Sequence, residues 1–289
     1  MPSRLFSIYA ALADSEDGEL RSHIEAWATP PSLATRGGGE EDEGSTELFT
    51  SALKEARKLG IVEENNDRLK ISSEVRGAKE NRRLPEAEFR TYISEVLFDR
   101  ARAAKAEQSA FMLAVAWLLS QNPLQPLNFS EAPQNMLKAE LGDQWEKTQL
   151  TNRSCYQNFL YWARYLGFAT FVGYGSERRV FPDPTNAIAE RLPRIFGDNQ
   201  ILDIESFLSK LSGILPVFEG GTVRAELDAM RTWTDTNENR LSIATSLAMQ
   251  RLADRGAITL ESVADARGRI LDFEVETARV SQIRRGATY

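Results

Sequence analysis

Apolar and polar positions alternate most regularly between residues 152 and 183. Apolar residues recur there at helical spacing as far as Leu166, and Gly167 follows them as a helix stop. The next segment, FATFV, has the β-branched and aromatic character of a strand. The turn GYGSERR then leads into a second strand that ends at Pro182. The pattern therefore predicts a helix followed by a two-stranded hairpin.

Two other stretches of the chain repeat this order of helix, glycine and strand. The segments ALKEARKLGIVE and AMQRLADRGAIT reach their glycines at Gly60 and Gly256, as FLYWARYLGFAT does at Gly167. The first and second copies share Leu, Ala, Arg, Leu and Gly at equal offsets, whereas the third keeps only its apolar spacing. The unequal intervals between the glycines exclude a solenoid of fixed period and indicate three diverged copies of one unit.

Shorter periodic segments precede each of these helices. In the first copy we expect helices at 4–13, 19–28 and 45–59, the last capped by Ser45 or Thr46, and strands at 61–62 and 69–71. In the second, helices at 107–120 and 130–141 come first, the latter capped by Ser130. The third is expected to have helices at 203–211, 223–230 and 240–254, paired strands at 257–260 and 270–273, and a polar, basic tail at 279–289. Helices at 85–103 and 186–196 join the copies, and the Gly-rich acidic stretch 35–44 is a predicted mobile loop.

Three helices followed by a hairpin form a winged helix-turn-helix domain. The motif LxxARxLG(I/F), at 53–61 and 160–168, with its strand–turn–strand sequel resembles that superfamily. The predicted fold is therefore mostly α with small β-wings, as three winged helix-turn-helix domains joined by helices. Its expected parts are a first domain at 1–78, a linker helix at 79–105, a second domain at 106–184, a connecting helix at 185–200, and a third domain with the tail at 201–289.

Composition is that of an ordinary globular protein. Hydrophobic residues make up 42% of the 289, which permits packed cores. The net charge of -7 is unlike that of a simple DNA-binding protein, although binding depends on a local basic face and not on the sum. A lone cysteine, Cys155, fits a reducing compartment. The first residues lack the apolar run and small-residue cleavage site expected of a signal peptide, and the longest apolar run, 111–119, is too short to span a bilayer. We therefore expect a cytoplasmic protein without membrane contact.

Residues that carry most enzyme chemistry are sparse. The single histidine, His23, is expected in or at the boundary of a core, and no cluster has the spacing of a zinc site. Cys155 is expected as a buried or half-buried thiol without an activating neighbour in the sequence. The glycines at 37–39 precede four acids that would repel a nucleotide, and Gly173 and Gly175 belong to a hairpin turn. The sequence therefore predicts no catalytic residue, no metal and no cofactor, so the protein is not expected to be an enzyme.

Nucleic-acid contact is the chemistry that the predicted architecture permits. The third helix of such a domain can enter the major groove while the hairpin touches the DNA backbone or minor groove. Both contacts need polar and basic side chains, and the second copy supplies them with only Glu177 opposing them locally. The predicted DNA-binding residues are Asn152, Arg153, Ser154, Gln157, Asn158, Arg164, Arg178 and Arg179. The alternative is that the two hairpin arginines are ordinary strand charges and that Asn152 and Ser154 only cap the helix.

The first and third copies carry weaker versions of this surface. Four acids at 40–43 precede the third helix of the first copy and favour a protein contact or a scaffold role there. Acids also offset the cations of the third copy. The candidate contacts are Thr46, Thr50, Ser51, Lys54 and Lys58 in the first copy, Asn237, Asn239, Arg240, Ser242, Thr245, Arg267 and Arg269 in the third, and Arg279, Arg284 and Arg285 in the tail.

The overall layout of these domains resembles the DpdG family, proteins of the bacterial Dpd clusters that handle 7-deazaguanine modification of DNA and the associated restriction. The resemblance implies a role in DNA modification linked to phage defence. With the residues above, it leads us to expect a non-catalytic DNA-binding or adaptor subunit that binds DNA and other protein subunits of a larger complex. A purely protein-binding structural scaffold and a transcription regulator are the alternatives.

Overall fold

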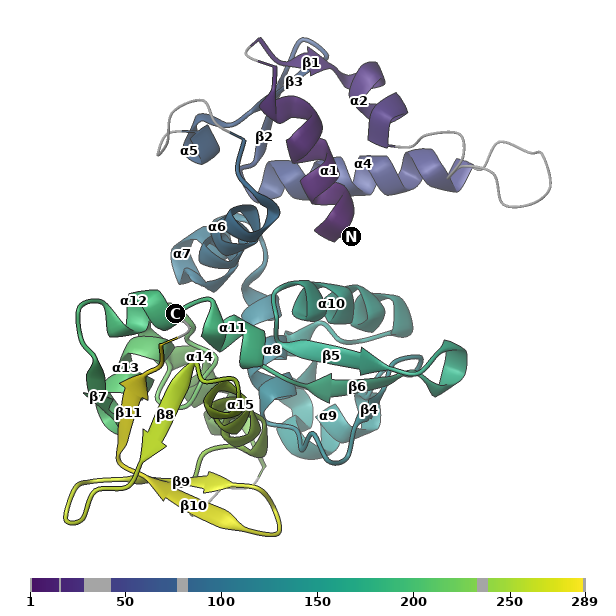
Figure 1. The fold of residues 1–289 in the computed structure, drawn as a ribbon. Helices are drawn as coiled ribbons and strands as arrows, with labels where there is room; N and C mark the ends of the chain where they lie inside the picture. Colours follow the sequence, from purple (N-terminus) through teal and green to yellow (C-terminus); the bar gives the residue numbers. More distant parts are fainter. Residues whose placement is uncertain (1, 16, 29–42, 77–82, 233–238, 288–289) are drawn as a thin grey trace. The chain divides into compact units, whose positions relative to one another are not determined.

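The computed structural model describes residues 2–15, 17–28, 43–76, 83–232 and 239–287. The chain divides into two compact units, Met1–Gln108 and Ser109–Tyr289, and each is described here by itself. Both are mostly helical with small antiparallel sheets, as expected (Figure 1). Within the described ranges, no helix is both long and apolar enough to cross a membrane.

Unit 1 packs its helices against a three-stranded sheet. The order of elements is α1 (Pro2–Ala13), β1 (Glu19–Leu20), α2 (Arg21–Ala28), α4 (Glu43–Lys58), β2 (Val62–Asn65), β3 (Arg68–Ile71), α5 (Ser73–Arg76), α6 (Glu86–Phe98) and α7 (Arg100–Lys105). The strands lie in the order β1-β3-β2, so β1, which follows the first helix, pairs with the last strand of the hairpin. Gly60 has a φ of 67°, the left-handed conformation that its place after the helix predicts. The apolar positions that defined the helices form the core, among them Leu5, Ile8, Leu12, Phe49, Leu53 and Ala56.

Two expectations for unit 1 are wrong in detail. The single helix predicted at 85–103 is broken in two at Asp99, whose carboxylate accepts a hydrogen bond of 2.8 Å from the backbone N–H of Arg102 and so caps α7. Helix α4 begins at Glu43, so the expected caps Ser45 and Thr46 lie inside it. The predicted loop at 35–44 lies outside the described residues as far as residue 42.

The first part of unit 2 contains the stretch with the clearest sequence pattern. Its elements are α8 (Ser109–Leu119), β4 (Leu127–Asn128), α9 (Gln134–Leu141), the 3₁₀ helix η1 (Gly142–Thr148), α10 (Arg153–Tyr165), β5 (Ala169–Val172), the 3₁₀ turn η2 (Gly175–Glu177) and β6 (Arg179–Pro182). The sheet order β4-β6-β5 repeats that of unit 1. Ser130 does not cap α9. Its backbone N–H instead donates to the Asn128 side chain at 2.7 Å, and the helix begins after Pro133.

The rest of unit 2 departs further from expectation. It contains α11 (Thr185–Ala189), α12 (Leu192–Phe196), β7 (Ile201–Asp203), α13 (Ile204–Ile214), α14 (Thr222–Met230), α15 (Ile243–Asp254), β8 (Ile258–Glu261), β9 (Arg269–Asp272), β10 (Thr277–Val280) and β11 (Gln282–Arg285). The predicted pairing of the strands near β8 and β9 is not formed. Instead β8 pairs with β11 in the sheet β7-β11-β8, and β9 pairs with β10.

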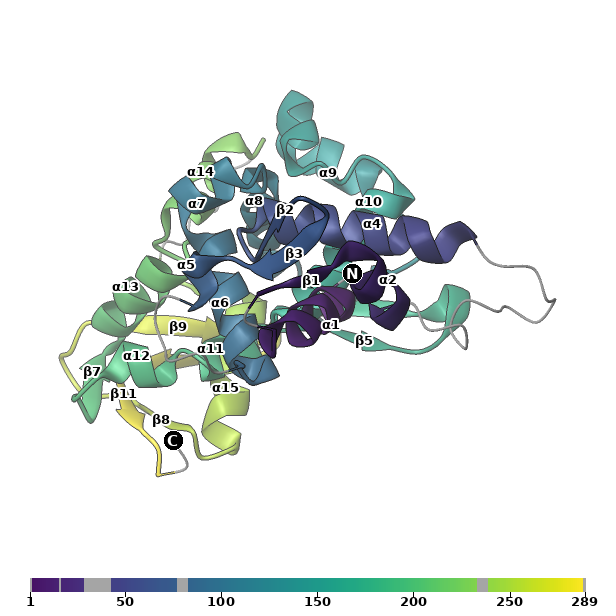
Figure 2. The same cartoon turned by 90° about the horizontal axis from the view of Figure 1, so that it is seen from above.

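Burial explains why the expected tail is a strand. Ile283 is fully buried between Leu202 of β7 and Leu260 of β8, and Val280 is only 3% exposed. In the sequence, arginines flank these two apolar positions, so the segment resembles a polar, basic tail. Helix α15 packs against α11, β8 and β9, and both ribbon views show α11 beside it (Figures 1 and 2).

Candidate nucleic-acid interface

Helix α10 presents one polar face to solvent. Asn152 precedes it, and its side chain accepts a 2.9 Å hydrogen bond from the backbone N–H of Cys155, so Asn152 is the N-cap. The helix buries Tyr156, Phe159, Leu160, Trp162 and Ala163. Because successive residues are about 100° apart around a helix, the remaining positions form a second face. That face exposes the predicted residues Arg153, Ser154, Asn158 and Arg164.

An aromatic cluster fastens this helix to the β5–β6 hairpin. The rings of Phe129, Tyr161 and Phe171 contact one another with centroids 5.2–6.2 Å apart. The guanidinium of Arg178 lies 4.7 Å from the centroid of Phe129, and that of Arg164 lies 5.2 Å from Phe171. Cation–π contacts of this kind contribute about 0.5–1 kcal/mol each at exposed sites. The cluster therefore joins helix and hairpin cations into one surface.

The two hairpin arginines face opposite sides of the sheet. Arg178 points to the α10 side, where Phe129 lies. Successive side chains of a strand alternate between faces, so Arg179, cross-strand from Val172, is directed to the other side. The sequence placed both residues in the hairpin but did not show this separation. The hairpin thus carries a cation on each face.

Gln157 has a different role from the exposed polar residues. Its side-chain amide donates a long hydrogen bond of 3.4 Å to the backbone carbonyl of Phe129, and the residue is half-buried. It therefore ties α10 to the segment after β4. Asn152 caps the helix and is also exposed, whereas Ser154 makes no capping hydrogen bond.

The arginines of this surface are uncompensated by acids. Within the parts of the chain that the structure describes, no carboxylate lies within the 4.0 Å ion-pair distance of Arg153, Arg164, Arg178 or Arg179. Glu177, exposed in the same turn, remains the local opposing charge. Each of the four arginines except Arg178, which is half-buried, is exposed. These guanidinium groups are therefore available to phosphate oxygens.

Several of the corresponding cations in the first and third copies are paired with acids. In the first copy, Arg57 at the end of α4 pairs with Glu64 and Lys58 pairs with Glu107. In the third copy, three arginines that were candidate contacts each meet a carboxylate at 2.7–3.1 Å. These ion pairs are Arg240–Asp272, Arg269–Glu205 and Arg284–Glu261. Pairing cancels most of the attraction that these groups would exert on phosphate.

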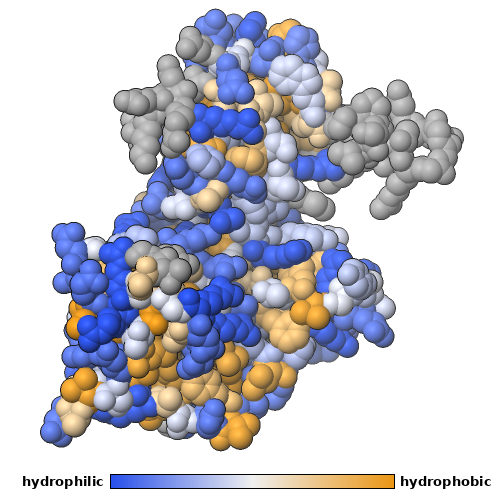
Figure 3. Space-filling model, viewed as in Figure 1, coloured by the Kyte–Doolittle hydropathy of each residue, from blue (hydrophilic) through white to orange (hydrophobic). Residues whose placement is uncertain are grey.

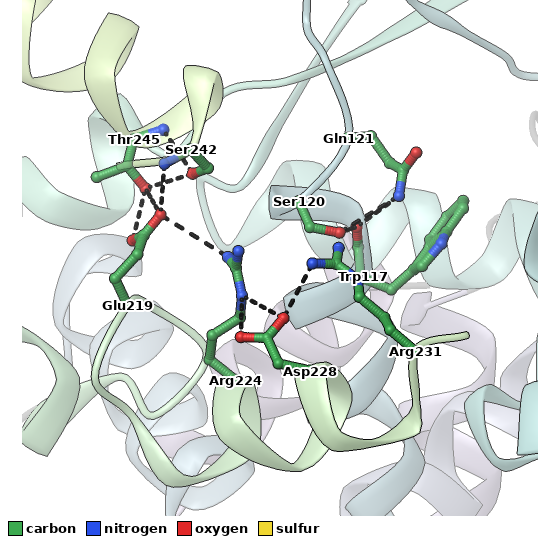
Figure 4. Close-up of polar contacts among 9 residues, drawn as sticks. All are labelled: Trp117, Ser120, Gln121, Glu219, Arg224, Asp228, Arg231, Ser242 and Thr245. Carbon is green, nitrogen blue, oxygen red and sulfur yellow. Dashed lines mark hydrogen bonds and ion pairs between the residues drawn. The ribbon is translucent and has the colours of Figure 1, made fainter. Parts of the chain in front are cut away.

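The start of α15 is also turned into the protein. Glu219 accepts hydrogen bonds from the backbone N–H of Ser242 at 2.9 Å and from the hydroxyl of Thr245 at 3.0 and 3.2 Å (Figure 4). Thr245 and Ser246 have no exposed surface. The candidate residue Asn237 lies outside the described residues. Helix α15 therefore lacks the open polar start that α10 has.

Two other sequence expectations are wrong. His23 is not a core residue. Its side chain is 55% exposed, and its ring nitrogen Nδ1 lies 3.1 Å from a carboxylate oxygen of Glu19. Cys155 is exposed at the start of α10, not buried. Among the residues described, no group of three or more His, Cys, Asp or Glu side chains is arranged to hold a metal ion.

Sequence reasoning missed Phe129 and Tyr174 as parts of this surface. Phe129 is the ring at the centre of the aromatic cluster, and only the strand pairing of β4 with β6 brings it there. Tyr174 is 89% exposed at the end of the hairpin. The sequence does contain a signal for Tyr174, because an aromatic residue between two glycines of a hairpin turn has no core to enter.

These features define a mostly helical protein of small antiparallel sheets, in which one helix and hairpin expose unpaired arginines around an aromatic cluster. The family comparison names the group more closely. The chain belongs to the DpdG-like family, whose model matches residues 1–266. The family is a component of Dpd DNA-modification systems, so the resemblance read from the sequence is confirmed. No curated protein and no solved structure matches the chain.

Proposed function

We propose that the chain is a non-catalytic DNA-binding adaptor of a bacterial Dpd DNA-modification or phage-defence system, built from three winged helix-turn-helix domains. The order of helices in each copy, and the β2–β3 and β5–β6 hairpins of the first two copies, support this domain type. The observation that carries the DNA-binding part is the set of uncompensated arginines on α10 and the β5–β6 hairpin. The family membership supports the setting in DNA modification.

Contact would be made by α10 and the hairpin together. The N-terminal half of α10, with Arg153, Ser154 and Asn158, would face base edges in the major groove. Arg164, Arg178 and Arg179 would bind phosphates, which position the protein without reading sequence. The aromatic cluster would keep helix and hairpin in a fixed relation, so binding would require little reordering.

The first and third copies would dock protein partners. Several of their cations are already paired with acids, and the third copy buries part of the start of its own third helix. Both features favour contact with protein over contact with phosphate. Partner proteins of the Dpd system would then carry the chemistry, and this chain would bring them to DNA.

Salt dependence of binding tests the DNA part. Each phosphate contact makes the slope of log K against log salt more negative by about 0.9, so the three phosphate-binding arginines predict a slope of about -2.7. Between roughly 50 and 200 mM salt, affinity for duplex DNA should fall about 40-fold. The Arg178→Ala/Arg179→Ala double variant should show a slope near -0.9 and a fall of about 3.5-fold. The charge-reversed Glu/Glu variant should not bind.

A matched control separates this site from a general charge effect. Lys210 and Arg267 are exposed cations of unit 2 outside the proposed surface. The Lys210→Ala/Arg267→Ala variant carries the same net charge as the Arg178/Arg179 double variant and should keep the wild-type slope. Equal slopes in the two double variants would move the site elsewhere.

Absence of DNA binding at low salt would instead favour the scaffold alternative, in which every copy binds only protein. The transcription-regulator alternative predicts a palindromic footprint near the operon of the protein. Neither is favoured by a particular feature of the described residues.

A further inference from the structure

The end of the β5–β6 hairpin presents a tyrosine ring to solvent. Tyr174 is 89% exposed and stands between Gly173, with a φ of 86°, and Gly175, with a φ of 54°. Its backbone is held in place, because its carbonyl accepts a 3.1 Å hydrogen bond from the N–H of Glu177. A Cβ at Gly173 would lie 3.0 Å from the carbonyl oxygen of Glu177, so the turn is tight as well as left-handed. The ring is thus exposed on a fixed support.

In the described parts of the chain, the Tyr174 hydroxyl forms no hydrogen bond and the Tyr174 ring contacts no other aromatic side chain. Val172, the last residue of β5, is also 56% exposed, so the apolar character continues along the hairpin. The end of the hairpin is coloured blue to white in Figure 3, as the polar turn sequence GYGSER leads one to expect. The π-face of the exposed tyrosine is nevertheless available for stacking.

The residues around the Tyr174 ring suit insertion of the hairpin end into a groove of DNA. Arg178 and Arg179 lie just after the turn and point to opposite faces of the hairpin. The minor groove of B-DNA is about 6 Å wide and has phosphates along both walls. A hairpin edge placed in this groove would bring one arginine toward each strand. Tyr174, at the end, would then be the side chain nearest the base pairs.

We propose that Tyr174 stacks on bases at a weakened step of the duplex, so that the site favours DNA containing a mismatch over a fully paired duplex. This proposal rests on the proposed DNA-binding function. Apolar and aromatic side chains enter a base stack only after neighbouring bases are unstacked, which costs free energy. A mismatched step is already weakened, so less is needed to open it. The ring offers no groups that read a particular base, and the preference would be for structure and not for sequence.

The test compares two duplexes that differ only by one central mismatch, each carrying a 2-aminopurine beside that position. Wild-type full-length protein should bind the mismatched duplex more tightly and change the 2-aminopurine fluorescence. Tyr174→Ala should weaken binding to the mismatched duplex about tenfold and remove the preference, since stacking on a single base has roughly that effect. Tyr174→Phe should keep both, because stacking does not need the hydroxyl.

Val275 supplies the matched control. It lies at the end of the β9–β10 hairpin and is 93% exposed, so Val275→Ala removes an equally exposed apolar side chain away from the site. This variant should bind both duplexes as the wild type does. Tyr174→Ala should also keep the wild-type salt slope, because it removes no phosphate contact.

Different results would refute the stacking role of Tyr174 and the proposed DNA binding. If the wild type binds DNA with the expected salt slope, but Tyr174→Ala keeps both the affinity and the ratio between the duplexes, the tyrosine does not stack on bases. A protein partner for the ring would give that result. If the wild type binds neither duplex at low salt, the DNA-binding function and the stacking role fall together.

Discussion

Removing the carboxylate of Glu219 should destabilise unit 2 without affecting DNA contact. Glu219 lies between α13 and α14 and joins α14 to the start of α15. It accepts hydrogen bonds from Ser242 and Thr245, and it lies 3.7 Å from the guanidinium of Arg224. The side chains of Glu219 and Arg224 are only 15% and 13% exposed, and Asp228 pairs with Arg224 from the other side (Figure 4). The carboxylate is therefore the link between two helices.

The size of the effect follows from these contacts. Removing one partner of a buried ion pair costs about 3–5 kcal/mol, because the other charge is left in a poorly solvated place. The bond from Arg224 to Asp228, at 3.1 and 3.2 Å, survives the change and favours the lower end of that range. We expect Glu219→Ala to lower the free energy of unfolding by about 3 kcal/mol, which is roughly 6–12 °C in Tm for a unit of this size. Glu219→Gln keeps the shape and one acceptor and should cost about half as much.

The Tm of each variant is measured by thermal unfolding followed by circular dichroism, and the free energy of unfolding is measured in urea. Glu276→Ala is the control, since Glu276 is an exposed carboxylate of the same unit. A loss below about 1 kcal/mol for Glu219→Ala would refute the view that this carboxylate holds the start of α15. A variant that folds normally but binds DNA less well would also contradict it, because that would place α15 at the DNA.

Three further predictions concern single groups of unit 2. The hydroxyl of Tyr156 is buried without a hydrogen-bond partner among the described residues, so Tyr156→Phe should leave the free energy of unfolding unchanged or raise it by about 1 kcal/mol; a clear loss in urea unfolding would show an unseen partner. Burial alone would raise the pKa of Asp183, but hydrogen bonds from Thr185 and the charge of Arg251 outweigh it and hold the pKa below its ordinary value. Its contribution to stability should therefore be present above the unfolded-state pKa of about 4 and be lost as pH falls through the lower folded pKa, and Asp183→Asn should flatten this acid limb of a stability-against-pH curve. The exposed thiol of Cys155 should react with a thiol reagent in the folded protein nearly as fast as in denaturant, and bound DNA should slow that reaction; a thiol protected in the free protein would contradict its placement at the start of α10.

The local pattern of apolar residues predicted where helices lie better than it predicted which strands pair. Helices were placed from apolar spacing, and the glycine stops at Gly60, Gly167 and Gly256 all have positive φ. The strand β11 was missed because its partners β7 and β8 lie far away in the sequence, and nothing local distinguishes RVSQIRR from a basic tail. The break at Asp99 was missed because the apolar spacing runs on across it. The strand partners of β11 lie outside the window that periodicity examines, whereas the Asp99 cap is local but is made by a polar side chain, which apolar spacing does not count.

The candidate site shows the same division. Its polar residues could be read from the sequence, because they follow from the position of one helix and one turn. The absence of carboxylates beside the arginines of the site could not be read from the sequence. Arg269 meets Glu205 from 64 residues away and Arg240 meets Asp272 from 32 residues away, so counting acids along the sequence does not show which arginines are paired. The aromatic cluster was hidden for a similar reason, since Phe129 reaches α10 only through the pairing of β4.

The acidic net charge of -7 therefore says little about the α10 surface. Charges separated by more than about 8 Å are largely screened at physiological ionic strength, so a phosphate at α10 responds to the groups beside it. Many of the acids lie next to cations of the first and third copies, and such pairs appear nearly neutral from a distance. The field at the hairpin is then set by Arg153, Arg164, Arg178 and Arg179 against Glu177. Because the four arginines lie on one helix and hairpin, the attraction of DNA to this surface should favour an orientation in which α10 and the hairpin face the phosphates.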